Sequence, residues 1–367
     1  MNKTHTIIPK SIGSKVLMLG VYYKNNAPGG MASVIQYYEN YYDGLRYIYT
    51  WKSTHSLGKL YYAFLAYLRT IFFLIFDRRI KIIHCHTAAD QSFFRKAKFI
   101  QLGKLFGKKV ILHVHASRFK DFYNESNRKE EIKNILNNVD SLIVLSNSWK
   151  AWFSDIIIDH SKLIVLNNIT DYPKIKEQAQ LNPNQLKVLF LGEIGQRKGV
   201  FDLLDVLAKN KEFFEDNLVL KIGGNNEEEK LINTINSNDL NRFVQFEGWV
   251  GGEKKVDLLN WADIYILPSY NEGLPIGILE AMSYGCAIIS SNVGGIPDII
   301  ISYKNGMLIN PGNKEEIKKA LIYFIENKEQ LTIFGSINKE VVKEYYPDYV
   351  MNCLKGIYSD LLLSGIA

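Results

Sequence analysis

Cysteine is scarce in this sequence of 367 residues, which contains three: Cys85, Cys286 and Cys353. They lie far apart, two of them within apolar runs, so they offer no disulfide framework of the kind that staples small secreted domains. Residues 1–14 also lack an apolar segment followed by a small-residue cleavage site. We therefore expect buried thiols, no secretory leader and a cytoplasmic protein.

Long blocks of like charge are also absent, and the net charge is only +6. Proteins that bind nucleic acid usually concentrate basic residues on one face, so we do not expect a nucleic-acid partner. The mild basic excess fits anionic substrates or an anionic membrane surface better.

Long apolar segments are also scarce. The exception is residues 57–76, which contain Arg69 near their middle. This segment approaches membrane-spanning length, but a charge near the centre of a bilayer is costly and no comparable segment follows. We therefore expect a buried helix, or one that lies on a membrane surface, and not a spanning helix.

Short apolar strands alternate with helical patterns in two series along the chain. The expected strands cover residues 15–23, 47–51, 80–84, 110–115, 141–145 and 162–166, then 187–191, 218–222, 244–246, 264–267 and 287–290. Such alternation favours parallel sheets with helices on both faces, and the chain is long enough for two cores. The fold class expected from the sequence is therefore α/β with two domains.

A polar stretch that includes Pro173 and Pro183 separates the two series and predicts a linker at residues 171–184. The expected domains are residues 1–170 and 185–347. The helical pattern of residues 348–367 follows Pro347, and we expect it to cross back to the first domain. Two such halves joined by a short linker predict a cleft between them.

Two glutamates mark the segment 269–297: Glu272 in a Gly/Pro-rich loop, and Glu280 in the apolar helix that follows. A helix start gathers unpaired backbone N–H groups, which attract phosphate. Because the residues around Glu280 are apolar, its carboxylate is not expected to be a simple solvated acid. The candidate phosphate-binding turn consists of Leu274, Pro275, Ile276 and Gly277, with the proline at the first helical position.

Together these segments resemble the retaining glycosyltransferases of family 4. The matching residues are Gly29–Gly30, His113–His115, Leu191–Gly199, Phe246–Val250, the Glu272–Glu280 block and Gly294–Pro297. The resemblance implies the GT-B fold, with two facing Rossmann-like domains and an interdomain cleft. It also implies transfer of a sugar from a nucleotide diphosphate sugar to an acceptor hydroxyl, with the anomeric configuration retained.

The same resemblance implies a metal-independent site that needs no cofactor besides the substrate, and the sequence contains no Asp-x-Asp triplet to hold a divalent cation. By match to the family, Glu272 would contact the donor sugar, and Lys198 would neutralise the departing diphosphate. His115 would lie near the reacting carbon, and Glu280 would hold the ribose hydroxyls.

Further positions match the family less specifically. Trp249 and Val250 would read the nucleotide base, while Gly29 and Gly30 would let the backbone approach phosphate or acceptor. The sequence departs from the family at Glu193, where an arginine is usual. The missing positive charge is expected from Arg197, beside Lys198, or from Arg118.

Three alternatives stay open on the sequence alone. The first is a zinc site. Two His-x-His pairs, His84 with His86 and His113 with His115, could supply its four ligands. A second alternative is an epimerase or phosphorylase of the same fold. The third is a protein that binds nucleotide sugars without catalysis, which the Glu193 departure allows.

The family and the aromatic segment 57–76 together suggest a lipid-linked saccharide as acceptor, at the inner face of the cytoplasmic membrane, in O-antigen, capsule or related surface polysaccharide synthesis. A UDP-sugar is the expected donor, from family frequency. Basic residues near the segment that are expected to meet lipid headgroups are Lys59, Arg69, Arg78, Arg79, Arg95 and Lys96.

Overall fold

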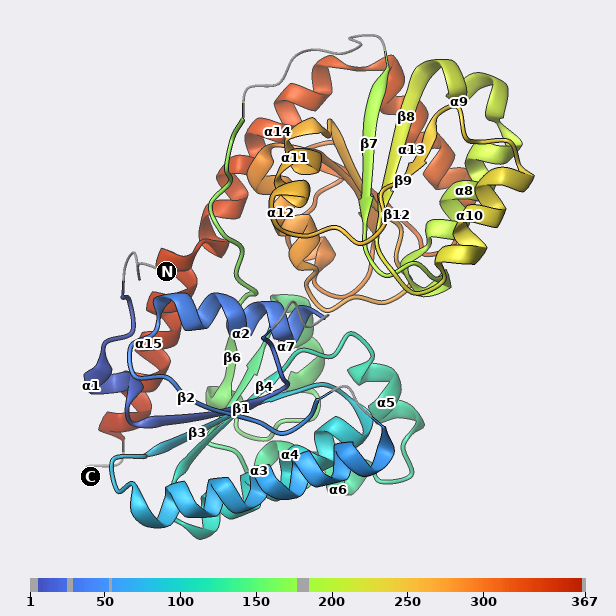
Figure 1. Ribbon diagram of the computed structural model, residues 1–367. Helices are drawn as coiled ribbons and strands as arrows, with labels where there is room; N and C mark the ends of the chain where they lie inside the picture. Colours follow the sequence, from blue (N-terminus) through green and yellow to red (C-terminus); the bar gives the residue numbers. More distant parts are fainter. Residues whose placement is uncertain (1–5, 25–28, 53–54, 177–184, 365–367) are drawn as a thin grey trace. The chain divides into compact units, whose positions relative to one another are not determined.

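The computed structural model describes residues 6–24, 29–52, 55–176 and 185–364. It divides into two compact units (Figure 1). Unit 1 contains the chain up to Ile169 and again from Tyr345, and unit 2 contains Thr170–Glu344. Each unit is an α/β layer structure built around its own parallel sheet.

The sheet of unit 1 has six strands in the order β2-β1-β3-β4-β5-β6. All neighbouring strands are parallel. The central strands are fully buried, as expected where helices cover both faces of a sheet. The strands are β1 (Val16–Gly20), β2 (Arg46–Tyr49), β3 (Ile82–Thr87), β4 (Lys109–Val114), β5 (Ser141–Val144) and β6 (Leu163–Val165).

Helices α3, α4 and α6 cover one face of this sheet, and α2 and α15 lie over the other (Figure 1). Pro347 does not precede the final helix, as the sequence suggested, but occupies its first turn, where a missing N–H costs nothing. The Tyr358 hydroxyl of α15 lies 2.7 Å from Nδ1 of His84 in β3. The helices of unit 1 are α1 (Lys10–Gly13), α2 (Gly30–Tyr41), α3 (Ser56–Phe76), α4 (Asp90–Leu105), α5 (Phe119–Glu125), α6 (Lys129–Asn137), α7 (Asn147–Ser154), the 3-10 turn η1 (His160–Lys162) and α15 (Pro347–Leu363).

The sheet of unit 2 is also six-stranded and parallel, with the order β12-β11-β10-β7-β8-β9. The sequence patterns missed the edge strand β12, whose four residues include a glycine and carry little periodicity. The strands are β7 (Leu186–Leu191), β8 (Leu218–Gly223), β9 (Val244–Phe246), β10 (Ile264–Leu267), β11 (Ala287–Ser291) and β12 (Gly306–Ile309).

Helices α11, α12 and α14 lie over one face of the second sheet, and α8, α10 and α13 over the other (Figure 1). The helices are α8 (Val200–Lys209), α9 (Lys211–Asn217), α10 (Glu228–Ser237), α11 (Gly252–Trp261), α12 (Ile276–Tyr284), α13 (Lys314–Glu326) and α14 (Glu329–Val341), with the 3-10 turns η2 (Gln196–Lys198), η3 (Ile296–Asp298) and η4 (Val342–Tyr345). The chain returns to unit 1 at Tyr345, the last residue of η4.

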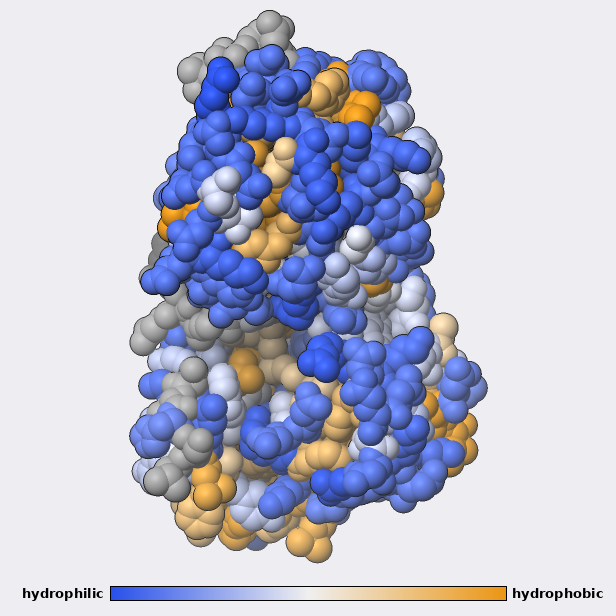
Figure 2. Space-filling model, turned by 90° about the vertical axis from the view of Figure 1, so that its right-hand side faces the viewer, coloured by the Kyte–Doolittle hydropathy of each residue, from blue (hydrophilic) through white to orange (hydrophobic). Residues whose placement is uncertain are grey.

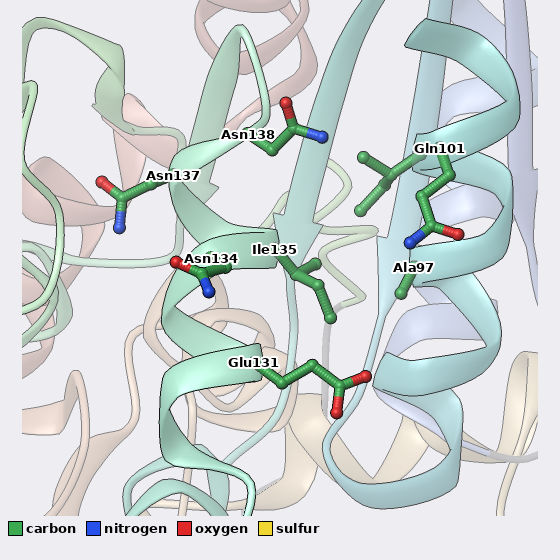
Figure 3. Close-up of a pocket in the computed structure, with 8 residues that line it drawn as sticks. Ala97, Gln101, Glu131, Asn134, Ile135, Asn137 and Asn138 are labelled. Atoms are coloured by element: carbon green, nitrogen blue, oxygen red, sulfur yellow. The ribbon is translucent and has the colours of Figure 1, made fainter. Parts of the chain in front are cut away.

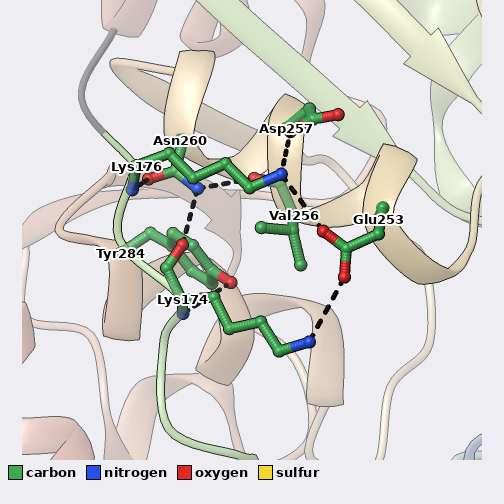
Figure 4. Close-up of polar contacts among 7 residues, drawn as sticks. All are labelled: Lys174, Lys176, Glu253, Val256, Asp257, Asn260 and Tyr284. Atoms are coloured by element: carbon green, nitrogen blue, oxygen red, sulfur yellow. Dashed lines mark hydrogen bonds and ion pairs between the residues drawn. The ribbon is translucent and has the colours of Figure 1, made fainter.

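The described part of the expected linker does not run free but lies along unit 2. The Lys174 amide donates to the Tyr284 hydroxyl at 3.1 Å, and the Lys176 amide donates to Asn260 Oδ1 at 2.9 Å. The Lys176 ammonium also pairs with Asp257 at 2.7 Å (Figure 4). Residues 177–184 of the expected linker lie outside the described residues.

Helix α3 buries one face and exposes the other. Ala66 and Leu74 belong to the core of unit 1, but only 17% of the stretch Gly58–Phe76 is buried. Among the described residues this stretch is the one long and apolar enough to cross a membrane. The exposed apolar side chains are Leu60, Tyr61, Phe64, Leu68, Phe72, Ile75 and Phe76. The alternative of a fully buried helix is therefore wrong.

Strand order places a topological switch point in each sheet. In unit 1, β2 lies on one side of β1 and β3 on the other, so the direction in which strands are added reverses between β1 and β3. In unit 2 the same reversal falls between β7 and β10. Parallel α/β sheets bind ligands outside the carboxyl ends of their strands at such points. Functional side chains are therefore expected at these two sets of strand ends.

Candidate functional site

In unit 2, an ion pair joins the loops that follow β7 and β10. Lys198 Nζ lies 2.5 Å from Glu272 Oε1, and the Ser269 hydroxyl donates to the same oxygen at 2.7 Å. A Cβ at Gly199 would clash with the Pro268 carbonyl oxygen, so only glycine lets the two loops close. The Glu272 side chain is 7% exposed. The fold thus brings together two of the expected catalytic residues at the switch point.

The helix after this loop begins one residue later than expected. Pro275 has extended backbone angles and caps α12, which starts at Ile276. The amides of Ile276 and Gly277 are in the first turn and have no intrahelical acceptor. A side chain at Gly277 would clash with the Tyr265 hydroxyl. Leu274 is buried beneath the turn.

Glu280 lies further along α12 and pairs with a residue that the sequence patterns did not single out. Lys255 Nζ, on α11, lies 2.5 Å from Glu280 Oε1. Burial raises the pKa of Tyr265 well above its usual value, and the charges of Glu280 and Glu272 raise it further. Both carboxylates therefore lie close enough to the buried Tyr265 phenol to disfavour its ionisation. Lys255 was missed because it sits in a Lys-Lys pair typical of any solvated helix.

The departure at Glu193 has a structural counterpart. Arg197 Nη2 lies 2.7 Å from Glu193 Oε2, and its Nη1 donates to the Asn271 carbonyl at 3.5 Å. The carboxylate that stands where the family has arginine thus holds the neighbouring arginine. Arg118 lies in unit 1, where it is exposed and 3.9 Å from Asp121.

The segment expected to read the base follows β9. The Gly224 amide donates to the Gly248 carbonyl at 2.9 Å, which fixes this segment against the end of β8. Val250 packs close to Gly223, where a Cβ would meet its methyl at 2.5 Å. The Trp249 side chain is 54% exposed. An exposed indole and a packed valine thus lie together at the carboxyl end of β8.

In unit 1, four histidines gather along β3 and the carboxyl end of β4. His86 Nδ1 lies 2.8 Å from His115 Nε2, and His86 stands opposite His113 in the strand register. Burial lowers the pKa of His84 and of His115 to about 3, and lowers that of His86 and His113 well below the usual range. The four rings are therefore neutral near pH 7.

Three of these histidines have nitrogen atoms within 4.8 Å of one another: His84, His86 and His113. The His84 ring, however, is stacked at 12° to that of His113 and at 22° to that of His86. Nearly parallel rings do not aim their nitrogen lone pairs at one point, so these side chains would have to turn before they could share an ion. The neutral rings fit a stacked cluster better than a preformed zinc site.

Gly29 and Gly30 lie at the start of α2, the helix that follows β1. Gly29 has a φ of 107°, a conformation that L side chains rarely adopt, and it caps the helix. A methyl group added at either glycine would meet no other described atom within 4 Å. Among the described residues, the space beside these two glycines is therefore open.

A separate pocket of about 630 Å³ lies between α4 and α6 in unit 1 (Figure 3). Its lining residues are Ala97, Ile100, Gln101, Glu131, Asn134, Ile135, Asn137 and Asn138. Asn137 is already engaged, since its amide donates to the Lys133 and Ile156 carbonyls. The pocket lies near the amino ends of β4 and β5, the edge opposite to that at which parallel sheets bind ligands.

Comparisons with known proteins agree with this geometry. Residues 171–341 match the family model of glycosyl transferases group 1. An uncharacterized glycosyltransferase of Methanocaldococcus jannaschii is 27% identical over 66% of this chain and 65% of its own length. The match therefore spans just under two thirds of that relative.

Two further proteins cover more of the chain. The UDP-Gal:alpha-D-GlcNAc-diphosphoundecaprenol alpha-1,3-galactosyltransferase of Escherichia coli is 24% identical over 81% of this chain and 80% of its own. The crystal structure of Anabaena HepE in complex with UDP-glucose superposes with a TM-score of 0.72 at 16% identity, covering 95% of this chain and 99% of HepE. The chain thus has the GT-B fold, its residues 171–341 match the group 1 glycosyl transferases, and over most of its length it is similar to glycosyltransferases that include a bacterial polysaccharide enzyme.

Proposed function

We propose that this chain is a retaining, metal-independent glycosyltransferase that moves a sugar from a UDP-sugar to a hydroxyl of a lipid-linked saccharide, in surface polysaccharide synthesis such as that of O-antigen or capsule. The observation that carries this proposal is the Lys198–Glu272 pair, placed at the β7/β10 switch point just before the start of α12. A diphosphate bound there would meet both the lysine and the first-turn amides.

The donor is proposed to bind along the carboxyl edge of the second sheet. The amides of Ile276 and Gly277 would hold the diphosphate, and Glu280 would accept hydrogen bonds from the ribose hydroxyls, with Lys255 fixing its carboxylate. Trp249 and Val250 would contact the base. Arg197 would add positive charge once it leaves Glu193.

The chemistry follows from where the charges lie. The bond between the anomeric carbon and the diphosphate oxygen breaks, and the acceptor oxygen bonds to that carbon on the same face. The departing diphosphate takes the acceptor proton. Lys198 stabilises the charge that develops on the leaving group, so the proposal needs neither a cofactor nor a protein nucleophile. Glu272 keeps Lys198 in position and contacts the donor sugar hydroxyls.

The acceptor is proposed to bind unit 1. His115, directly after β4, would lie near the reacting carbon. Its imidazole would be neutral, because its pKa is about 3. Gly29 and Gly30 would form a turn that the acceptor approaches closely.

A lipid-linked acceptor fits the exposed apolar face of α3. Figure 2 shows hydrophobic residues along the lower edge of unit 1, where α3 lies in Figure 1. Lys59, Arg78 and Arg79 lie near the two ends of this helix and are exposed, as expected for contact with anionic headgroups. We propose that the protein is cytoplasmic and binds the inner face of the membrane peripherally through α3.

A vesicle test addresses this membrane contact. Burying Leu68 and Phe72 in lipid is worth about 1.5–3 kcal/mol each, so replacing both by serine should weaken sedimentation with anionic vesicles at least tenfold. The matched control is Ile232→Ser, which removes an exposed apolar side chain from unit 2. Equal sedimentation of the double variant and the wild type would contradict the proposal.

The central test is a screen of UDP-sugars and GDP-mannose against the purified protein. A true donor should raise Tm in proportion to the logarithm of its concentration over its Kd. With that donor and a saccharide acceptor, NMR should show a product with the anomeric configuration of the donor, in the presence of EDTA. An inverted product, or the absence of both binding and transfer for every nucleotide sugar, would refute the proposed function.

A further inference from the structure

Residues 174–176 of the linker bind two helices of unit 2 at once, and we call them the strap (Figure 4). The Lys174 amide donates to the Tyr284 hydroxyl in the last turn of α12 at 3.1 Å. The Lys176 amide donates to Asn260 Oδ1 on α11 at 2.9 Å, and Asn260 Nδ2 donates back to the Lys174 carbonyl at 2.9 Å. The strap therefore joins α11 to α12 through its backbone.

The lysine side chains of the strap add ion pairs along α11. Lys174 Nζ lies 3.3 Å from Glu253, and Lys176 Nζ lies 2.7 Å from Asp257. These groups are exposed, so the pairs contribute little to stability by themselves. They do show which side of the helix the strap binds, because Glu253, Asp257 and Asn260 are spaced by four and three residues. Such positions lie on one face of a helix.

Lys255 lies on a different side of α11 and makes another contact with α12. It follows Glu253 by two residues, which at 3.6 residues per turn is about 200° around the helix. Its Nζ lies 2.5 Å from Glu280 Oε1. Glu280 and Tyr284 are four residues apart, so they lie on the same face of α12. Helix α11 is thus held by the strap on one side and by Glu280 on another, and both contacts lead to one face of α12.

The orientation of the Glu280 carboxylate depends on the distance between these two helices. A lysine side chain is long and has much rotamer freedom, so Lys255 fixes a carboxylate only while its backbone stays in place. If α11 shifted, Lys255 Nζ would move away from Glu280 Oε1. The carboxylate would then lose the partner that orients it, and small errors in the position of a binding group are costly.

We propose that the strap is a positioning element of the donor site: it holds α11 against α12, so that Lys255 keeps the Glu280 carboxylate oriented toward the ribose hydroxyls. Asn260 and Tyr284 are then positioning residues that do not touch the substrate. The proposal rests on the proposed function, because it takes Glu280 as the ribose contact. It extends the donor site to the segment by which the chain enters unit 2.

Binding of UDP and of 2′,3′-dideoxy-UDP, measured by calorimetry, tests this role. The second nucleotide lacks both ribose hydroxyls, so the ratio of the two Kd values reports the ribose contact. Asn260→Ala removes the acceptor of the Lys176 amide, and Tyr284→Phe removes only the oxygen that accepts from the Lys174 amide. Each change should raise Kd for UDP about three- to tenfold and leave Kd for the dideoxy nucleotide unchanged.

The matched control is Asn210→Ala at the end of α8. The Asn210 side chain donates to the carbonyl four residues earlier, as that of Asn260 does to Val256, but it does not touch the strap. Its removal should leave both Kd values near those of the wild type. Tyr284→Phe deletes a single atom, so it decides the question even if Asn260→Ala does not fold. An equal loss of affinity for both nucleotides would mark a purely structural role and overturn the inference.

A cycle of double variants tests whether the strap acts through Lys255. In the Lys255→Met background, Asn260→Ala should raise Kd for UDP by less than about twofold more, because the side chain that it positions is already gone. Effects that simply multiply would contradict the inference.

Glu280→Gln separates this inference from the proposed function. If it weakens UDP binding but Asn260→Ala and Tyr284→Phe do not, the strap has no part in the site while the donor assignment stands. If Glu280→Gln leaves the affinity unchanged, or if UDP does not bind the wild type, the donor assignment itself is wrong and the inference falls with it.

Discussion

Removing the lysine of the Lys198–Glu272 pair should separate its role in catalysis from its role in stability. The two side chains are 15% and 7% exposed, so the pair is largely shielded from water. Loss of a charge that stabilises a developing anion in such a site costs about 100- to 1,000-fold in kcat, or roughly 2.7–4 kcal/mol. We expect a loss of this order for Lys198→Met.

The same change should also destabilise unit 2. Without the lysine, the Glu272 carboxylate keeps the hydrogen bond from the Ser269 hydroxyl at 2.7 Å but loses its cationic partner. Leaving one member of a buried pair unpaired costs about 3 kcal/mol, which corresponds to a Tm lower by roughly 6–12 °C for a domain of this size. Adding Glu272→Gln removes the unpaired charge, so the double variant should regain most of the stability and none of the activity.

The assay measures UDP release with acceptor, alongside Tm by calorimetry. Lys209→Met is the matched control, because it removes an exposed lysine that pairs with Asp205 on the same unit. It should leave both quantities near those of the wild type. A folded Lys198→Met protein that keeps more than a tenth of kcat would refute the role in stabilising the leaving group. Recovery of activity in the double variant would show that the pair is only structural.

Three other perturbations follow from the same geometry. Glu280→Gln should raise KM for the donor about tenfold with little change in kcat, as initial rates over a donor series would show, because ribose contacts do not change during the reaction. Glu193→Gln frees Arg197 from its ion pair, so kcat/KM in the same assay should be unchanged or rise a few-fold. A tenfold fall would contradict the proposal that Arg197 adds positive charge once it leaves Glu193. His84 has a native pKa of about 3, so below pH 6.5 the unfolded chain binds a proton at this residue and the folded chain does not. His84 alone should therefore lower the stability by about 1.4 kcal/mol per pH unit, and His86, His113 and His115 add to this fall. Unfolding curves between pH 7 and 4.5 should be less steep in pH for His84→Gln, and unchanged in slope for the exposed control His160→Gln.

The cluster of histidines shows how far a sequence pattern reaches. Alternation along two strands allowed His84, His86, His113 and His115 to share one face of the sheet, and the structure brings them together. It could not give the angles between the rings, which packing against Tyr358 and the neighbouring strands decides. Those angles are what separate a stack of neutral rings from a set of metal ligands.

Partners distant in sequence were beyond prediction for a similar reason. Nothing in the sequence connects Lys255 with Glu280, because the two meet only when α11 and α12 pack side by side. The burial of Lys96 was equally hidden. In the sequence it is a basic residue near an aromatic helix, and only the structure shows that its side chain is fully buried. The expectation that Lys96 meets lipid headgroups is therefore wrong, since its ammonium does not reach the surface.

The sequence by itself determined the α/β class, most strands, and the loop and helix that carry Glu272 and Glu280, because these depend on local periodicity and on glycine and proline at turns. Strand order, which sets the two switch points, and the pairing of charges across loops were decided only by the tertiary structure. A charge is stabilised or destabilised by the groups that surround it in space. Those groups come from distant parts of the chain, which local sequence patterns do not connect.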